Sequence, residues 1–261
     1  MTNVLLSVVL AAVVAVTAYR TRALTAGGAA AAFAVGAIVF GTGGVPAALV
    51  LLAFFLPSTL LSRLGRERKR ALDAIGKQGP RDGWQVLANG GVAAACALLA
   101  LRGGWPFAAA YAGAFAAAAG DTWGTEIGTL SRGMPISLVT FRPVAVGLSG
   151  GVTTVGSAAT VAGSVVVALV AALAGVAAFW PVALGGVAGA FVDSLIGATL
   201  QSQRWCPRCT RACETNPHAC GCATEVRRGL AWIENDAVNF AATLSGALIA
   251  GSLAQAASGS R

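Results

Sequence analysis

The stretch "AAAAGDTWGTEIGTL" (residues 116–130) ends an alanine-rich apolar run with two carboxylates, Asp121 and Glu126. A carboxylate beside such a run is costly in a membrane unless a partner needs its charge. The rest of the chain has the same apolar character: 56% of its 261 residues are hydrophobic, 11% are charged, and the mean hydropathy is +0.74. This composition excludes an ordinary soluble globular protein and indicates an integral membrane protein.

The predicted fold is all-α: a polytopic bundle with about eight membrane spans of roughly 20 apolar residues each, in a single integral membrane domain of residues 1–261. The apolar runs cover about residues 2–18, 26–41, 44–61, 84–101, 105–122, 153–178, 181–200 and 236–256. The runs 26–41 and 105–122 are short, so either is a candidate for a re-entrant or broken helix. We interpret the first run as a helix and not as a removed signal peptide, because it lacks a preceding basic segment and a convincing cleavage site. With 34 glycines, the bundle is expected to pack by close backbone approach.

Basic residues predict the orientation of the bundle. The chain has 18 Lys and Arg against 10 Asp and Glu, a formal net charge of +8. The basic residues gather around residues 20–22, in a basic loop at 62–83, around 132–142, and in a Cys-rich loop at 201–233. With eight spans these connections share one side, which the positive-inside rule makes cytoplasmic, with both termini outside. We expect the protein to lie in the plasma membrane of a prokaryote. Basic residues that do not set the orientation are expected to bind membrane lipid or a polyanionic substrate, and no nucleic-acid partner is expected.

The few acidic residues identify a candidate site. Five lie in the two loops and are assigned to balancing nearby basic charge, Glu214 among them; the other five lie at or inside apolar spans: Asp121, Glu126, Asp193, Glu234 and Asp236. On the eight-span topology Asp121, Glu126, Asp193 and Asp236 are close to the cytoplasmic face, so they are the predicted catalytic residues of one shared pocket. Mg²⁺ is commonly held by one or two carboxylates plus substrate phosphates, and its predicted ligands are Asp121, Asp193 and Asp236.

Structural alternatives remain open for each of these acids. Asp193 is also suited to an interhelical hydrogen bond, Asp236 to capping the last helix, and Asp121 with Thr122 to a helix end. Asp121 and Glu126 point about 140° apart on an ideal helix, so either the helix breaks near Gly124 or the two acids have different roles.

Helix periodicity and polar residues extend the site. One face of the helix predicted over 181–200 presents a residue every four positions: Gly185, Gly189, Asp193, Gly197 and Gln201. Because three of them are glycines, this face has few side chains and suits a ligand or a closely packed neighbour. In "ENDAVNF" (residues 234–240), Asn235 and Asn239 lie on adjacent turns. The predicted substrate- and nucleotide-binding residues are Arg63, Lys69, Asn89, Thr122, Ser194, Gln201, Asn235 and Asn239. The Gly-rich segment 148–164 suits phosphate binding or, in a membrane protein, helix packing.

The Cys-rich loop contains five of the six cysteines and the only histidine. Cys206 and Cys209 have the two-residue spacing of a zinc knuckle. In a reducing cytoplasmic loop we favour a structural Zn²⁺ over disulfides or free thiols. The candidate ligands are Cys206, Cys209, Cys213, His218, Cys220 and Cys222, and the irregular spacing after Cys209 leaves the last two ligands open.

Several motifs carry a family resemblance. "LSRLGRERK" (61–69), "WQVLANGG" (84–91), "AGDTWGTEIG" (119–128), "GGVTTVGSAATVAG" (150–163), "GAFVDSLIGATLQ" (189–201) and "ENDAVNF" occur in this order over nearly the whole chain. Together they resemble the integral membrane family of domain of unknown function ninety-two, or transmembrane protein nineteen, whose plant member is the phytyl-phosphate kinase of tocopherol synthesis. The resemblance implies phosphoryl transfer from a nucleoside triphosphate, with CTP expected, to an isoprenyl monophosphate such as phytyl or geranylgeranyl phosphate. It also implies Mg²⁺ as cofactor.

A transporter or flippase for a lipid phosphate or a cation is the alternative from another functional class. In that case the same acids would line a translocation path, which is expected near the bilayer midplane. Acids gathered toward one side favour the kinase.

Overall fold

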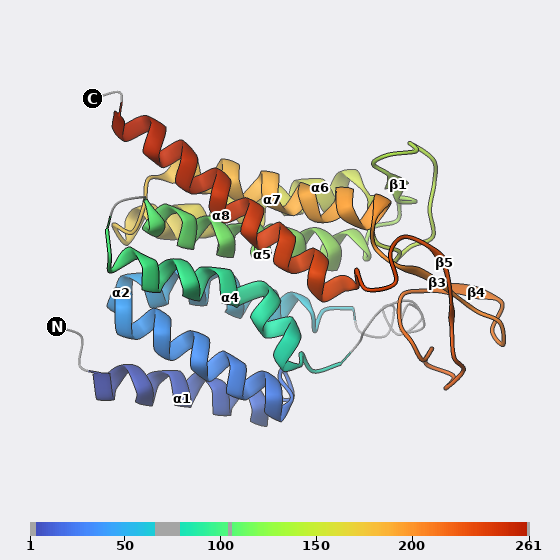
Figure 1. Cartoon of the computed structure of the whole chain (residues 1–261), viewed down its shortest axis with the longest axis horizontal. Helices are drawn as coiled ribbons and strands as arrows, with labels where there is room; N and C mark the ends of the chain where they lie inside the picture. The colour runs from blue at the N-terminus through green and yellow to red at the C-terminus, as the bar shows by residue number, and fades with distance from the viewer. Residues whose placement is uncertain (1–3, 66–78, 104–105, 260–261) are drawn as a thin grey trace.

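The computed structural model describes residues 4–65, 79–103 and 106–259, and within these ranges it contains seven α-helices. They are α1 (Val4–Arg20), α2 (Ala26–Leu61), α4 (Gly83–Ala100), α5 (Phe107–Gly128), α6 (Thr154–Leu173), α7 (Phe179–Thr199) and α8 (Asn235–Gly259). The helices lie side by side in one bundle (Figure 1). Five of them, α2, α4, α6, α7 and α8, are long and apolar enough to cross a membrane. The structure therefore confirms the all-α polytopic membrane bundle.

Helix α2 contains two of the predicted spans. At Gly44 the backbone leaves the helical conformation, with φ 62° and ψ −153°, which glycine adopts without a Cβ clash. After Gly44 the chain returns toward the start of α2. A hydrogen bond shows this: Arg63, just after α2, donates from Nη2 to the carbonyl oxygen of Thr21, just before α2, at 3.1 Å. Both ends of α2 therefore lie at the same end of the bundle, and the predicted runs 26–41 and 44–61 are its two arms.

The connections gather as the basic residues predicted. In Figure 1 the N-terminus and the C-terminus are drawn toward one end of the bundle, and the β-strands lie at the opposite end, which we call the loop end. Arg63, Arg81 and the connections 129–153 and 200–234 also belong to the loop end. With α2 counted as two arms, the helices of the described residues form eight segments along the bundle, which correspond to the eight predicted apolar runs; five of the seven helices are long and apolar enough to cross a membrane.

Helix α5 lies at the centre of the bundle, and its residues 109–120 are all buried. It runs unbroken from Phe107 to Gly128, so the structure decides against a broken helix in the run 105–122 and against a break near Gly124, the two alternatives that the sequence left open. Small residues allow this central position, because neighbouring backbones come close. A Cβ added at Gly113 of α5 would lie 2.5 Å from the carbonyl oxygen of Gly246 in α8.

The glycine face of α7 is filled by a neighbouring helix and not by a ligand. A Cβ added at Gly189 would lie 2.7 Å from the carbonyl oxygen of Ala242 in α8 and 2.8 Å from the Cβ of Ala117 in α5. Helix α7 ends at Thr199, so Gln201 lies beyond the helix and does not continue this face as predicted. The Gly-rich segment 148–164 likewise packs against its neighbours, since Gly156 of α6 lies close to Gly124 and Gly128 of α5.

Hydroxyl groups connect distant helices inside the bundle. The Tyr111 hydroxyl donates to the carbonyl oxygen of Ala47 (2.6 Å), joining α5 to the second arm of α2. The Thr243 hydroxyl donates to the carbonyl oxygen of Ala88 (2.9 Å), joining α8 to α4. Such hydrogen bonds are typical of membrane helix packing, where apolar burial alone does not drive association.

The connections at the loop end contain short strands that the sequence analysis did not predict. Strands β1 (Ile136–Ser137) and β2 (Gly151–Val152) pair antiparallel between α5 and α6. In the Cys-rich loop, β3 (Gln203–Cys206), β4 (Arg211–Cys213) and β5 (Glu225–Arg228) form an antiparallel sheet in the order β4-β3-β5. This loop is therefore a small folded unit at the loop end of the bundle (Figure 1).

Candidate active site

Three helices bring two carboxylates and two amides together at the loop end. The side-chain nitrogen of Asn239 donates to Asp193 Oδ2 (3.2 Å) and to Asp121 Oδ2 (3.3 Å), with the amide oriented so that its hydrogen bonds are satisfied. In the same orientation the Asn239 oxygen accepts from Asn235 Nδ2 (2.9 Å). We call Asp121, Asp193, Asn235 and Asn239 the acid–amide cluster. All four were predicted site residues, and the structure joins them through Asn239.

The positions of these residues along their helices explain why they meet. Asp121 lies about two turns before the end of α5, Asp193 lies in the last two turns of α7, and Asn235 and Asn239 lie in the first two turns of α8. Helices α5 and α7 run toward the loop end and α8 runs away from it, so these segments lie at one depth (Figure 1). Asn239 is buried, and two carboxylates around one amide concentrate negative charge. Such a site suits a cation with oxygen ligands.

Arg81 adds a positive charge beside the acids. Burial lowers the pKa of Arg81, whereas the negative charges of Glu126 and Asp121 raise it. The backbone of Arg81 is held in place, because its N–H donates to the carbonyl of Ala23 and its carbonyl accepts from the N–H of Thr25, both at 3.0 Å. The Arg81 side chain is therefore held close to two of the predicted catalytic acids. Asp121 and Glu126 point in different directions from α5, yet the charges of both act on Arg81.

Sequence reasoning counted Arg81 only among the basic residues of the loop 62–83. The available signal was the capping box that follows it, in which Asp82 accepts from the Gln85 N–H and Gln85 accepts from the Asp82 N–H, each at 3.0 Å. A capping box marks the first turn of a helix, so it places the preceding arginine at the membrane boundary of α4.

An apolar cavity of about 250 Å³ lies next to Arg81, between α1, α2, α4 and α5. Its walls are mostly aliphatic and aromatic, with Val39, Phe54 and Phe115 among them. Its polar lining residues are Arg81, Gln85 and Asn89. Asn89 donates from Nδ2 to the Gln85 carbonyl (3.0 Å), so this predicted binding residue belongs to the cavity and not to the acid–amide cluster. The cavity suits an apolar chain with a polar group at the arginine.

The remaining predicted residues fall in different places. Thr122 is buried and follows Asp121, and Ser194 is half-buried and follows Asp193. Arg63 donates to the backbone of Thr21, and Lys69 lies outside the described residues. Asp236 is half-buried in the first turn of α8, but within the described part of the chain the oxygens of Asp121, Asp193 and Asp236 do not all lie within 4.8 Å of one another. The predicted Mg²⁺ ligands therefore do not form a compact group of three, and Asn239 bridges two of them, Asp121 and Asp193.

Glu214 is a site residue that sequence reasoning missed. It accepts hydrogen bonds from the Ser149 N–H (2.7 Å), the Ser149 hydroxyl (2.9 Å) and Gln201 Nε2 (3.0 Å). Burial raises the pKa of Glu214, and the hydrogen bonds from Ser149 lower it. Its charge also acts on Asp193. Glu214 thus connects the Cys-rich loop to the segment before α6, and the 65-residue separation from Ser149 left no local signal for this contact.

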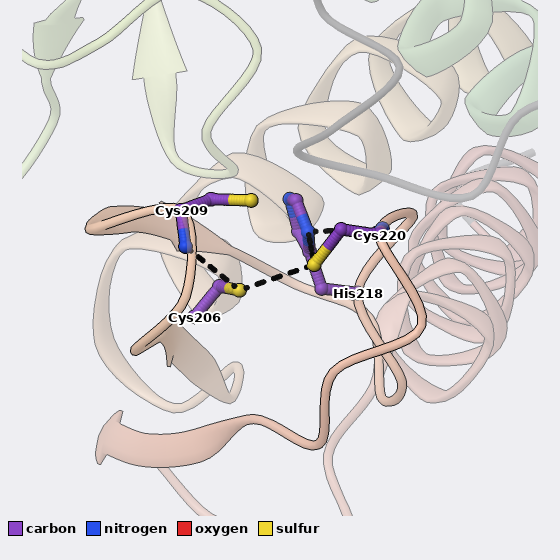
Figure 2. Close-up of side chains that lie close together, drawn as sticks. All are labelled: Cys206, Cys209, His218 and Cys220. Atoms are coloured by element: carbon purple, nitrogen blue, oxygen red, sulfur yellow. Dashed lines mark hydrogen bonds between the residues drawn. The ribbon is translucent and has the colours of Figure 1, made fainter.

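The Cys-rich loop brings four of its six predicted metal ligands together. Four possible ligand atoms all lie within 4.8 Å of one another, one from each of Cys206, Cys209, His218 and Cys220 (Figure 2). Cys213 and Cys222 lie outside this group.

Comparison with known proteins agrees with this architecture. The family model described as integral membrane protein DUF92 matches residues 9–247. The chain belongs to this family. The match contains the whole acid–amide cluster, Arg81 and the four clustered metal ligands, and it confirms the resemblance inferred from the motifs.

Three relatives are similar to this chain over most of their length. This DUF92 protein is 31% identical over 234 residues to Protein PGR of Arabidopsis thaliana, covering 78% of this chain and 81% of that protein. It is 32% identical over 202 residues to an uncharacterized membrane protein of Methanocaldococcus jannaschii, covering 75% and 82%. It is 27% identical over 241 residues to an uncharacterized membrane protein of Synechocystis, covering 88% and 82%. None of the solved structures matches this chain. The protein is therefore an integral membrane protein of the DUF92 family.

Proposed function

We propose that this protein is a membrane-embedded kinase that transfers a phosphoryl group from a nucleoside triphosphate, with CTP as the expected donor, to an isoprenyl monophosphate. One observation carries the proposal: Arg81 lines the apolar cavity, and its positive charge interacts with the negative charges of Asp121 and Glu126. It therefore connects a site for an apolar chain to a site for phosphates and a cation.

The cavity is the proposed site of the acceptor. Its apolar walls suit a phytyl or geranylgeranyl chain, and the guanidinium of Arg81 suits the terminal phosphate, because arginine binds phosphate through paired N–H donors. Gln85 and Asn89 provide further amides on the same wall. The acceptor phosphate would then lie between Arg81 and the acid–amide cluster.

The acid–amide cluster is the proposed site of the donor phosphates. The oxygens of Asp121 and Asp193 fit Mg²⁺, which prefers carboxylate oxygens and usually needs only one or two from the protein. When bound, Mg²⁺ would neutralise charge on the donor phosphates. Asn239 orients both carboxylates through its hydrogen bonds, and Asn235 orients Asn239. Arg81 would offset the charge of the acceptor.

The reaction forms a bond between an oxygen of the acceptor phosphate and the γ-phosphorus of the donor, and it breaks the bond from that phosphorus to the β-phosphate oxygen. The products are an isoprenyl diphosphate and a nucleoside diphosphate. Phosphoryl transfer asks the protein mainly to position the reactants and to balance charge. We further propose that the loop end faces the cytoplasm of a prokaryote, where the nucleotide is found, because basic residues gather there.

The test is direct measurement of the product. Purified protein with Mg²⁺ and geranylgeranyl monophosphate would be incubated with each nucleoside triphosphate separately, and the products analysed by mass spectrometry. We expect a diphosphate with CTP, and a loss of at least about 100-fold in rate for Asp193→Asn, because the variant removes a charge that acts in the transition state. Glu225→Gln is the matched control, since Glu225 is exposed and forms an ion pair with the exposed Arg227 in the Cys-rich loop.

Full activity of Asp193→Asn would refute the assigned site. No product with any donor, from protein shown to be folded, would refute the kinase and favour the transporter. The position of the acid–amide cluster toward one end of the bundle is what favours the kinase, since a transport site is expected near the midplane.

A further inference from the structure

The Cys-rich loop contains a second cluster of reactive side chains that the proposed kinase chemistry does not use. Cys206 is the last residue of β3 and Cys209 lies in the turn between β3 and β4, whereas His218 and Cys220 lie between β4 and β5. Figure 2 shows the four side chains turned toward a common centre. The two halves of the cluster come from different connections of the small sheet. An ion bound by all four side chains would therefore link these two connections.

The first half has the local structure of a zinc knuckle. The backbone N–H of Cys209 donates to Cys206 Sγ (3.4 Å), and Thr210 has a positive φ of 49° where the chain turns into β4. Cys206 is fully buried at the end of β3. A backbone N–H directed at a sulfur stabilises a thiolate, which is the form that binds metal.

The distances within the cluster favour a metal ion over a disulfide. Cys206 Sγ and Cys220 Sγ are 3.6 Å apart. Two sulfurs bound to one tetrahedral zinc at about 2.3 Å each are separated by roughly 3.8 Å, whereas a disulfide needs about 2.05 Å. His218 Nδ1 lies 3.1 Å from Cys220 Sγ. The spacing of the sulfurs is therefore already close to that of a zinc site.

His218 provides an independent indication of a missing ligand partner. The side chain is only 4% exposed, and its Nε2 atom has no hydrogen-bond partner among the described residues. Buried polar atoms without partners are rare and often mark an ion that binds there. A metal ion bound through Nε2 would remove this cost.

We propose that Cys206, Cys209, His218 and Cys220 bind a structural Zn²⁺. Four protein ligands fill a tetrahedral zinc ion, so the site leaves no open position for catalysis and instead stabilises the fold of the loop. The structure thereby narrows the six candidate ligands to four. Cys213 is directed elsewhere, with its Sγ 3.9 Å from the carbonyl oxygen of Thr215.

The ion would also position Glu214. This residue lies between the two ligand pairs along the chain and accepts the hydrogen bonds of Ser149 and Gln201. Closing the loop through zinc holds Glu214 against the segment before α6. The proposal concerns the structure of the loop, so it does not depend on the kinase assignment.

The test is the metal content of the full-length protein, purified in detergent without chelators. We expect about one zinc per chain for the wild type and a loss of at least about tenfold in Cys206→Ser and Cys220→Ser. Cys222→Ser is the matched control from the same loop and should keep its zinc. Replacement of zinc by Co²⁺ should give the visible absorption of a tetrahedral site with thiolate ligands, which does not require any variant to fold.

Three results would overturn the proposal. The first is a wild-type protein that contains no zinc and takes up no Co²⁺ in a thiolate site. The second is a disulfide between Cys206 and Cys220 in the wild-type protein, detected by mass spectrometry without reduction. The third is equal loss of zinc from Cys222→Ser and Cys206→Ser.

Discussion

Replacing Asn239 by Asp is the most informative perturbation of the acid–amide cluster, because it changes charge and hydrogen bonding with almost no change in shape. The amide nitrogen of Asn239 donates to one oxygen of Asp193 at 3.2 Å and to one of Asp121 at 3.3 Å. The variant puts an acceptor oxygen in place of this donor. It therefore removes both hydrogen bonds and brings a third carboxylate against the first two.

The structure sets the magnitude of the effect. A hydrogen bond to a charged group contributes about 1.5–3 kcal/mol, so the loss of two costs about 3–6 kcal/mol. Repulsion between unit charges at the observed separations is about 5 kcal/mol per pair at an effective dielectric constant of about 20, an upper limit because a proton or a cation can relieve it. We expect Asn239→Asp to destabilise the protein by at least about 3 kcal/mol without divalent cation. Added Mg²⁺ should restore much of this loss.

The assay is thermal unfolding of detergent-purified protein at neutral pH, with and without Mg²⁺. The matched control is Asn216→Asp, because Asn216 is exposed and its side-chain oxygen, which the variant keeps, accepts hydrogen bonds from the N–H and the hydroxyl of Thr224. This control should change stability by less than about 0.5 kcal/mol. The reasoning is refuted if Asn239→Asp unfolds at the wild-type temperature, or if Mg²⁺ raises the unfolding temperatures of both variants equally.

Further predictions concern the cavity and the helix packing. Arg81→Gln should raise the KM for the isoprenyl monophosphate at least about tenfold by removing a charged phosphate contact, while Arg22→Gln in the first connection should leave it unchanged; equal effects in a kinetic assay would exclude a specific role for Arg81. Gly189→Ala should lower stability by about 1–3 kcal/mol through overpacking against α8, whereas Gly41→Ala has open space around its Cβ and should be tolerated. Thermal unfolding of the two glycine variants compares them, and equal melting temperatures would contradict the packing argument.

Part of the site could be predicted because membrane-embedded polar residues are few. Asp121, Asp193, Asn235 and Asn239 were all identified from their positions at the ends of apolar runs, and the structure brings them together. Arg81 and Glu214 were not identified, because each looks like one charge among many in a polar loop. Their importance depends on neighbours far along the chain, such as Ser149 for Glu214.

The class of fold and the end of the bundle at which the basic connections gather could be predicted from the sequence, because they follow from the length of apolar runs and the placement of charge. How residues from different helices meet became visible in the folded structure. It showed the contact of Asn239 with both acids, the place of Arg81 beside the cavity, and the proximity of His218 and Cys220 to Cys206 and Cys209. Each of these depends on backbone direction and on contacts between distant segments, for which local composition and spacing contain no information.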